Sequence, residues 1–130
     1  MIIDSSALIA ILLQESEAER IARAIALDST RLMSAATWLE ISIAVFLRAG
    51  EEGLRSLDLL AAKYQINVVP LTPMQAEIAR RAFKQYGKGI HPARLNFGDC
   101  IVYALVKDSG EPLLFKGEDF NQTDIVPVIY

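Results

Sequence analysis

Short apolar runs of the length of buried strands alternate with helical patterns along the whole chain, and this alternation constrains the fold more than any other feature. Strands joined through helices pair in parallel, because each helix carries the chain back to the same end of the sheet. The 130 residues contain no linker, repeat or low-complexity segment. We therefore predict a single α/β domain over residues 1–130, with three layers and a parallel sheet of four to five strands flanked by helices.

Turn and capping residues set the expected limits of these elements. Strands are predicted over residues 1–4, 31–33, 66–71 and 112–117, with an edge strand over 124–129 that Pro127 interrupts. Helices are predicted from a cap at Ser5 or Ser6 through residue 13, from a Ser16/Glu19 capping box to about residue 27, over 35–49 up to Gly50, over 51–64, from Thr72-Pro73 to Gly87, and from Asn96 through Lys107. Residues 88–95 are expected to form a loop.

The predicted helix over residues 35–49 is apolar on nearly every side, which indicates burial on most of its faces. Hydrophobic residues make up 52% of the chain and charged residues 22%, and the apolar excess suggests an interface with another chain. No apolar run reaches the ~18 residues that span a bilayer, and no signal peptide opens the chain. These features predict a cytoplasmic protein without a membrane contact.

Cysteine and histidine usage limits the possible chemistry. One cysteine, Cys100, permits neither an internal disulfide nor a two-cysteine zinc or redox motif, and it is expected to be a small buried side chain. One histidine, His91, excludes sites that need two imidazoles. A metal in this chain would therefore be bound by oxygen ligands. The net charge of −3 argues against nucleic-acid binding through bulk positive charge, so any such binding must be local.

Three acidic residues stand in apolar surroundings. Asp4 follows the first predicted strand, Glu40 lies in the middle of the apolar helix 35–49, and Asp99 lies on the apolar stripe of the helix that starts at Asn96. The ligand sites of open parallel sheets lie beyond the carboxyl ends of the strands, where Asp4 falls. Lysine and arginine are absent from residues 1–19, 33–47 and 95–106. Buried carboxylates without a basic partner favour a divalent cation.

Simpler roles also fit each acid taken alone. Asp4 can cap the first helix, and Asp99, three residues after Asn96, can complement the helix dipole. Glu40 can pair with a distant arginine across the fold. A fourth acid is expected from the segment after strand 112–117, where Glu118, Asp119 and Asp124 are all candidates and a polar surface loop is the alternative.

With these residues in hand, the chain resembles the PIN-domain ribonucleases and, within them, the toxin component of VapBC-type toxin–antitoxin pairs. The matching segments are IIDSSALIAILLQESEAER at 2–20, LMSAATWLE at 32–40, YGKGIHPARLNFGDC at 86–100 and PLLFKGEDFNQTDI at 112–125, in the family's order and spacing. The family's four acidic site positions fall on Asp4, Glu40, Asp99 and Asp119. Ser6 matches its small hydroxyl residue, while Ser5 stands where Thr is more common.

The resemblance implies an endoribonuclease toxin with a PIN-like fold, a homodimer, and inhibition by a cognate VapB-type antitoxin, with no direct DNA binding by this chain alone. Hydrolysis of a phosphodiester would use Mg²⁺ or Mn²⁺, with Asp4 and Asp99 as direct ligands and Glu40 and Asp119 acting through water or a second ion. Ser6 would orient Asp4 or a metal-bound water.

Basic residues beside these acids answer the objection from net charge. Lys88, Arg94 and Lys116 lie in the predicted loops before Asp99 and Asp119, where they could bind the RNA backbone, although ordinary surface charge also explains them. His91 could contact RNA or belong to a turn with Pro92.

Three other classes of protein also place acids at strand ends or share this fold. Aspartyl-phosphate phosphatases need a second acid at position 6, which is serine here, and receiver domains need an aspartate after a central strand, which residues 66–72 lack. A catalytically inactive PIN-like binding or regulatory module remains the alternative, which the presence of all four acids disfavours.

Overall fold

The computed structural model describes residues 1–130 and contains a four-stranded parallel sheet in the order β3-β2-β1-β4. The strands are β1 (Ile2–Ile3), β2 (Leu32–Ser34), β3 (Asn67–Val69) and β4 (Leu113–Leu114). Every pair of neighbouring strands is parallel, so all the carboxyl ends meet at one edge of the sheet. The predicted α/β class and parallel sheet are therefore confirmed, with four strands.

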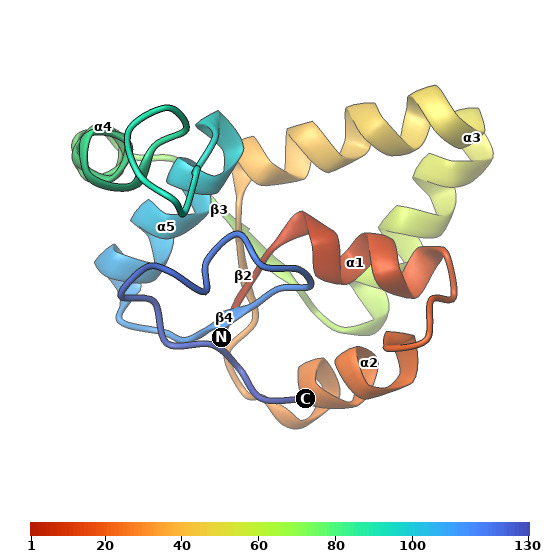
Figure 1. The fold of residues 1–130 in the computed structure, drawn as a ribbon. Helices are drawn as coiled ribbons and strands as arrows, with labels where there is room; N and C mark the ends of the chain where they lie inside the picture. Colours follow the sequence, from red (N-terminus) through yellow and green to blue (C-terminus); the bar gives the residue numbers. More distant parts are fainter.

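Five helices cover the two faces of this sheet (Figure 1). They are α1 (Ser5–Leu12), α2 (Ala18–Leu27), α3 (Ala35–Lys63), α4 (Pro73–Tyr86) and α5 (Phe97–Ser109). Helices α4 and α5 lie on one side of the strands, and α1, α2 and α3 lie on the other (Figure 1). The arrangement is the expected three-layer one.

Alternation along the strands divides the core between the two sides of the sheet. Ile2 and Leu113 pack in the cluster formed with α4 and α5, whereas Ile3 and Leu114 pack in the cluster formed with α1, α2 and α3. All four side chains are buried. Successive side chains of a strand point to opposite faces, so strands of only two residues still connect the two halves of the core.

Helix α3 bends at Gly50, where two helices were predicted to meet. Gly50 has φ 59° and ψ −150°, a conformation that side chains with a Cβ rarely adopt. A second helical segment follows this residue up to Lys63, turning sharply and running back toward the sheet (Figure 1). The predicted division at Gly50 is therefore confirmed, as a kink between two helical segments of α3.

Several predicted limits and caps are wrong. Asp4 caps α1 in place of Ser5 or Ser6, and the Ser16/Glu19 box is absent because α2 begins at Ala18, which places Glu17 and not Ser16 at its N-cap position. The strands are shorter than predicted because the main-chain pairing between neighbouring strands covers only two or three residues of each. The proposed strand 124–129 is reduced to an isolated bridge between Leu113 and Pro127, since proline lacks the N–H that a longer ladder needs.

The first half of α3 is not buried on most sides, contrary to the prediction. Leu47 is 80% exposed and Ile43 is 52% exposed, while Ile41 on the opposite face is buried. Helix α3 packs against α1, α5 and strands β2 and β3. Its apolar outer face is consistent with the expected interface with another chain, not with burial inside this domain. No helix is both long and apolar enough to cross a membrane.

Candidate active site

The acids singled out from the sequence gather around the carboxyl end of β1. The first, Asp4, leaves β1 and caps α1, and its main-chain N–H donates to the Leu114 carbonyl at 2.9 Å. The Ser6 N–H donates to Asp4 Oδ2 at 3.0 Å, and the Ser6 hydroxyl donates to the same oxygen. Burial raises the pKa of Asp4, and the charge of Asp119 raises it further against these hydrogen bonds. Ser6 thus contacts Asp4, which is one of the two partners expected for it.

Asp99 lies in the first turn of α5 and has two roles. It completes a capping box with Asn96: the Asp99 N–H donates to the Asn96 side chain, and the Asn96 N–H donates to Asp99 Oδ2, both at 2.9 Å. Asp99 therefore does have the simpler helix-end role. Burial raises the pKa of Asp99 to about 6, with added contributions from Asp119, Asp4 and Glu40. Because the charges of the other three acids raise its pKa, Asp99 belongs to one electrostatic group with them.

Glu40 is exposed, and the prediction that it points into apolar surroundings is wrong because Ile43, Ala44 and Leu47 on its stripe are exposed as well. Its carboxylate nevertheless lies over the first turn of α5. A Cβ on Gly98 would stand 2.7 Å from Glu40 Oε2, so glycine alone permits this approach. The sequence reasoning missed Gly98, although a glycine two residues after a helix cap is a signal of close approach.

Asp119 is exposed and stands on the loop that follows β4, two residues after Gly117, which has φ 115°. Its charge raises the pKa of both Asp4 and Asp99. Glu118 and Asp119 line one surface hollow together with Asp99, and the Glu118 carboxylate accepts from the Asn121 side chain. Glu118 and Asp119 therefore both lie near the N-terminal end of α5, where Asp99 stands.

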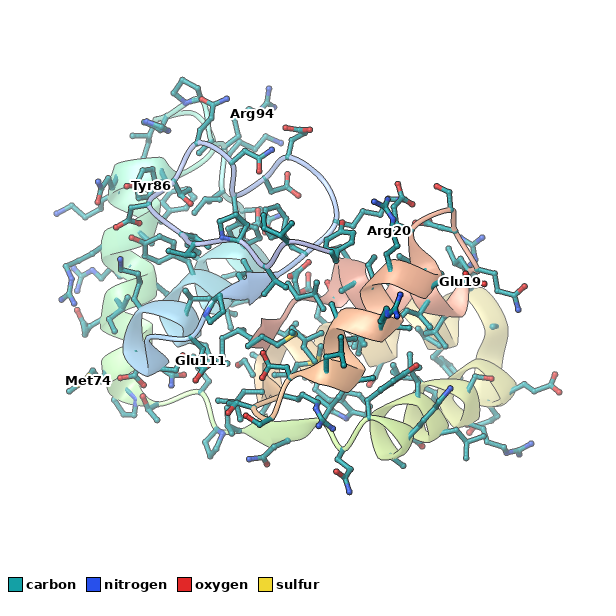
Figure 2. The ribbon with its side chains drawn as sticks, turned by 90° about the horizontal axis from the view of Figure 1, so that it is seen from below. Glu19, Arg20, Met74, Tyr86, Arg94 and Glu111 are labelled. Carbon is teal, nitrogen blue, oxygen red and sulfur yellow. The ribbon has the colours of Figure 1, made fainter.

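Asp124, the third candidate for the fourth acid, lies at the other end of α5. Its carboxylate accepts from the Tyr103 hydroxyl and the Lys107 ammonium, each at 2.8 Å. The Lys107 ammonium holds the pKa of Asp124 below its usual range. Figure 2 shows Arg94 and Glu111, which flank α5 in the sequence, at its opposite ends. Asp124 is thus paired and distant from Asp99.

None of the four acids Asp4, Glu40, Asp99 and Asp119 has a salt-bridge partner. The oxygen-only donor set and the raised pKa values of Asp4 and Asp99 fit a hard divalent cation. As the side chains stand, no three acidic, histidine or cysteine groups converge closely enough to hold one ion together. Binding would therefore draw the flexible carboxylates inward, a movement that their mutual repulsion opposes without a cation.

A basic rim borders this acidic group. Lys88 and Arg94 line a hollow of about 350 Å³ together with Asp99 and Asp119. Arg94 adopts a positive φ of 55°, and Figure 2 shows it at the outer end of the loop between α4 and α5. This loop is closed by a bridge between Gly87 and Leu95. Strain at a residue bordering the acids is common at functional sites.

The other residues considered at the site are structural or paired. The Lys116 ammonium, predicted to meet RNA, lies 2.5 Å from Glu15 and 3.0 Å from Glu17. His91 Nδ1 accepts from the Ala93 N–H at 3.1 Å, and its ring meets Tyr86 edge-on, so the turn explains its position. The remaining candidate, Cys100, is buried and free, as expected, and burial raises the pKa of its thiol to about 11.

Comparisons with known proteins agree on one family. The family model described as PIN domain matches residues 1–126. The chain is 50% identical over 128 residues to ribonuclease VapC30 of Mycobacterium tuberculosis, with 98% of each chain covered. It is also 50% identical over 128 residues to ribonuclease VapC of Mycolicibacterium smegmatis, covering 98% of this chain and 99% of that one.

Solved structures share the fold at low sequence identity. Mycobacterium tuberculosis VapC20, described as a sarcin-ricin loop cleaving toxin, superposes with a TM-score of 0.77 at 18% identity, covering 98% of this chain and 97% of that one. A chain of a toxin-antitoxin complex from Klebsiella pneumoniae gives a TM-score of 0.75 at 20% identity, with 99% and 97% covered. These likenesses show a shared three-layer architecture.

Proposed function

This chain belongs to the PIN domain family, among the VapC ribonucleases, and from that premise we propose that it hydrolyses RNA phosphodiester bonds with Mg²⁺ or Mn²⁺ held by Asp4, Glu40, Asp99 and Asp119. One observation carries the proposal: four carboxylates lie near one another with no cationic partner, and burial and mutual repulsion raise the pKa values of Asp4 and Asp99. Retaining such repulsion is unfavourable for folding, which favours a role in binding a cation.

Each acid has a defined part in this proposal. Asp4 and Asp99 are direct ligands, because one is oriented by Ser6 and the other by the Asn96 N–H. Glu40 and Asp119, on more exposed positions, act through water or a second ion. A bound divalent cation would neutralise phosphoryl charge and lower the pKa of a water molecule. Asp99, with a pKa of about 6, is mostly ionised at neutral pH and ready to bind.

The basic rim supplies the local attraction for RNA that the net charge of −3 does not. Lys88 and Arg94 line the hollow that contains Asp99 and Asp119, so a phosphate that they bind lies beside the acids. Arginine and lysine contacts to phosphates orient a nucleic acid without reading its sequence. The rim therefore positions the backbone and leaves the choice of RNA to other contacts.

RNA cleavage with and without metal tests this function. The purified protein is expected to cut RNA with Mg²⁺ or Mn²⁺ and to stop in excess EDTA. Undiminished cleavage in chelator would overturn the metal mechanism. No cleavage with any divalent cation, across a broad set of cellular RNAs, would favour the inactive binding module instead.

Two exposed apolar surfaces support a homodimer and a cognate antitoxin as partners. One groove, of about 370 Å³, lies between α1 and α3 and includes Leu12 and Leu47. The other, of about 330 Å³, lies between α4 and α5 and includes Phe83 and Phe97, which is 82% exposed. Exposed apolar grooves of this kind commonly bind protein.

The partner proposal is tested on the free protein and on the protein expressed with its neighbouring gene product. Light scattering is expected to show a dimer, weakened by Leu47→Ser or Phe97→Ser. Expression without a partner is expected to slow growth, and expression with the antitoxin to restore it. A strict monomer at tens of micromolar, together with no growth defect, would contradict both partners.

A further inference from the structure

Lys116 is tied to a distant part of the chain by its side chain and its backbone. Its ammonium lies 2.5 Å from Glu15 and 3.0 Å from Glu17, in the turn between α1 and α2. Its main-chain N–H donates to the Ser6 hydroxyl at 3.0 Å. These contacts join residues about a hundred positions apart, as the 101-residue separation of Lys116 and Glu15 shows. Both ends of α1 are thus attached to the start of the loop after β4.

The same serine that accepts from Lys116 also orients an acid of the site. The Ser6 hydroxyl donates to Asp4 Oδ2, so its single proton is committed to Asp4 while its oxygen receives the Lys116 N–H. A shift of Lys116 would therefore move the hydrogen-bond partner of Asp4. The main-chain bond from Asp4 to Leu114 strengthens this connection.

Lys116 also anchors one end of the short loop that carries Asp119. The other end is anchored by Phe120, which is buried and packs edge-on against Phe115 at 5.1 Å between ring centres. Between these two anchors stands Gly117, which has a positive φ and, because it lacks a Cβ, restrains the backbone little. The position of Asp119 therefore depends on both anchors holding.

We propose that Lys116, clamped by Glu15 and Glu17, is a positioning residue that sets the spacing of Asp4 and Asp119 for metal binding. This inference rests on the proposed function, because it concerns affinity for the proposed cation. The proposed role of Lys116 differs from the RNA contact expected from its place in the sequence. Two carboxylates neutralise the charge of Lys116, whereas Lys88 and Arg94 form no salt bridge. Groups that orient metal ligands commonly change metal affinity 10–100-fold when they are removed.

Two sets of substitutions break the clamp from opposite sides. Lys116→Met removes the ammonium, and the double variant Glu15→Gln/Glu17→Gln removes its partners while keeping the lysine. If Lys116 positions the acids, both raise the dissociation constant for Mn²⁺, measured by calorimetry without RNA, by about tenfold. Lys116→Arg, which can keep both ion pairs, is expected to restore most of the affinity. Circular dichroism verifies that each variant is folded, as expected for partly exposed side chains.

An RNA contact by Lys116 would give the opposite pattern. Lys116→Met would then raise the KM for RNA with unchanged Mn²⁺ affinity, and the double glutamine variant would lower KM by freeing the ammonium. That result, or wild-type Mn²⁺ affinity in both variants, overturns the clamp while leaving the proposed function intact. Wild-type protein that binds no Mn²⁺ or Mg²⁺ overturns the proposed function and the clamp with it.

Discussion

The two ends of α5 place aspartates in opposite environments. At its N-terminal end, Asp99 stands with Asp4, Glu40 and Asp119, has no basic partner, and has a raised pKa of about 6. At its C-terminal end, Asp124 binds Lys107 and Tyr103 and has a lowered pKa. Asp119 and Asp124 come from the same segment of the chain, only five positions apart. Neighbouring acids can therefore serve different purposes, one group suited to a cation and one fastening the C-terminal segment to α5.

The largest expected difference between the two ends is in catalysis. Asp99→Asn is expected to lower the rate of RNA cleavage by about 10²–10³-fold or more, because it removes a charge from the proposed metal ligands. Asp124→Asn, the matched change at the other end, is expected to leave cleavage within about twofold of wild type. Rates at saturating RNA measure both. The assignment of Asp119 as the fourth acid would be wrong if Asp124→Asn or Glu118→Gln lowered the cleavage rate more than Asp119→Asn does.

Glycines at the two ends provide a second matched pair. Gly98→Ala is expected to displace the Glu40 carboxylate and lower cleavage about 10–100-fold with little loss of stability, because only the flexible end of Glu40 must move. Gly110 caps the C-terminus of α5 at φ 74° and has open space around it. Gly110→Ala is therefore expected to destabilise the fold by about 1 kcal/mol without lowering cleavage. Wild-type cleavage by Gly98→Ala would remove Glu40 from the site.

Basic residues at the two ends should differ in their effect on RNA binding. Lys88→Gln and Arg94→Gln are each expected to raise KM several-fold and to reduce the slope of log affinity against log salt by about 0.7–0.9, because each phosphate contact releases counterions. Lys107→Gln removes the same charge at the Asp124 end and should change neither quantity. Equal effects of all three variants would indicate a general charge effect and no defined rim.

The smallest expected difference is in how pH changes stability without metal. A carboxyl group with a raised pKa binds more protons folded than unfolded, so Asp99 destabilises the fold as pH rises from about 4 through about 6. When the pH is lowered from 7.5 to 5.5, the melting temperature in EDTA is therefore expected to rise. The rise should correspond to no more than about 1 kcal/mol of unfolding free energy, because solvent partly screens the Asp99 carboxylate. Asp99→Asn should reduce the rise by the part that Asp99 contributes, since Asp4 also has a raised pKa and contributes with the same sign.

Asp124 has the opposite sign because its pKa is lowered. Its contribution is complete above the ordinary aspartate pKa of 3.8 and is lost as pH falls below that value. Asp124→Asn should therefore weaken the loss of stability in acid and leave the change between pH 7.5 and 5.5 as in wild type. A wild-type melting temperature that falls over that interval would contradict the raised pKa of Asp99.

The parts of the fold that could be predicted from the sequence are those governed by neighbouring residues. The Thr72 cap with Pro73 in the first turn of α4, and the Asn96 cap of α5, were predicted and are present because capping depends on residues within one turn. The Ser16/Glu19 box failed because α2 begins one residue later than expected, at Ala18, with Glu17 at its N-cap position. Strand order and the exposure of α3 depend on contacts between distant segments, which local patterns do not contain.

The candidate site shows the same limit. Asp4 was identified from its place at a strand end and Asp99 from its place on an apolar helical stripe, both of which can be seen locally, and the structure places them in one electrostatic group. Glu40 was selected for burial that it does not have, since an apolar stripe does not reveal whether it faces the core or a partner. Lys116 could not be assigned correctly to its contacts, because Glu15 and Glu17 lie far away in the sequence.

Thermal melts in EDTA and in Mg²⁺ test most directly whether the acids at the N-terminal end of α5 are retained for a metal. Mg²⁺ should raise the melting temperature of wild type, because a ligand that binds only the folded state stabilises it. Asp99→Asn should be at least as stable as wild type in EDTA and lose most of the Mg²⁺ response, while Asp124→Asn should be less stable by about 0.5–1 kcal/mol and keep the response. A lowered melting temperature of Asp99→Asn in EDTA, together with an unchanged Mg²⁺ response, would contradict the account and leave Asp99 as a helix cap.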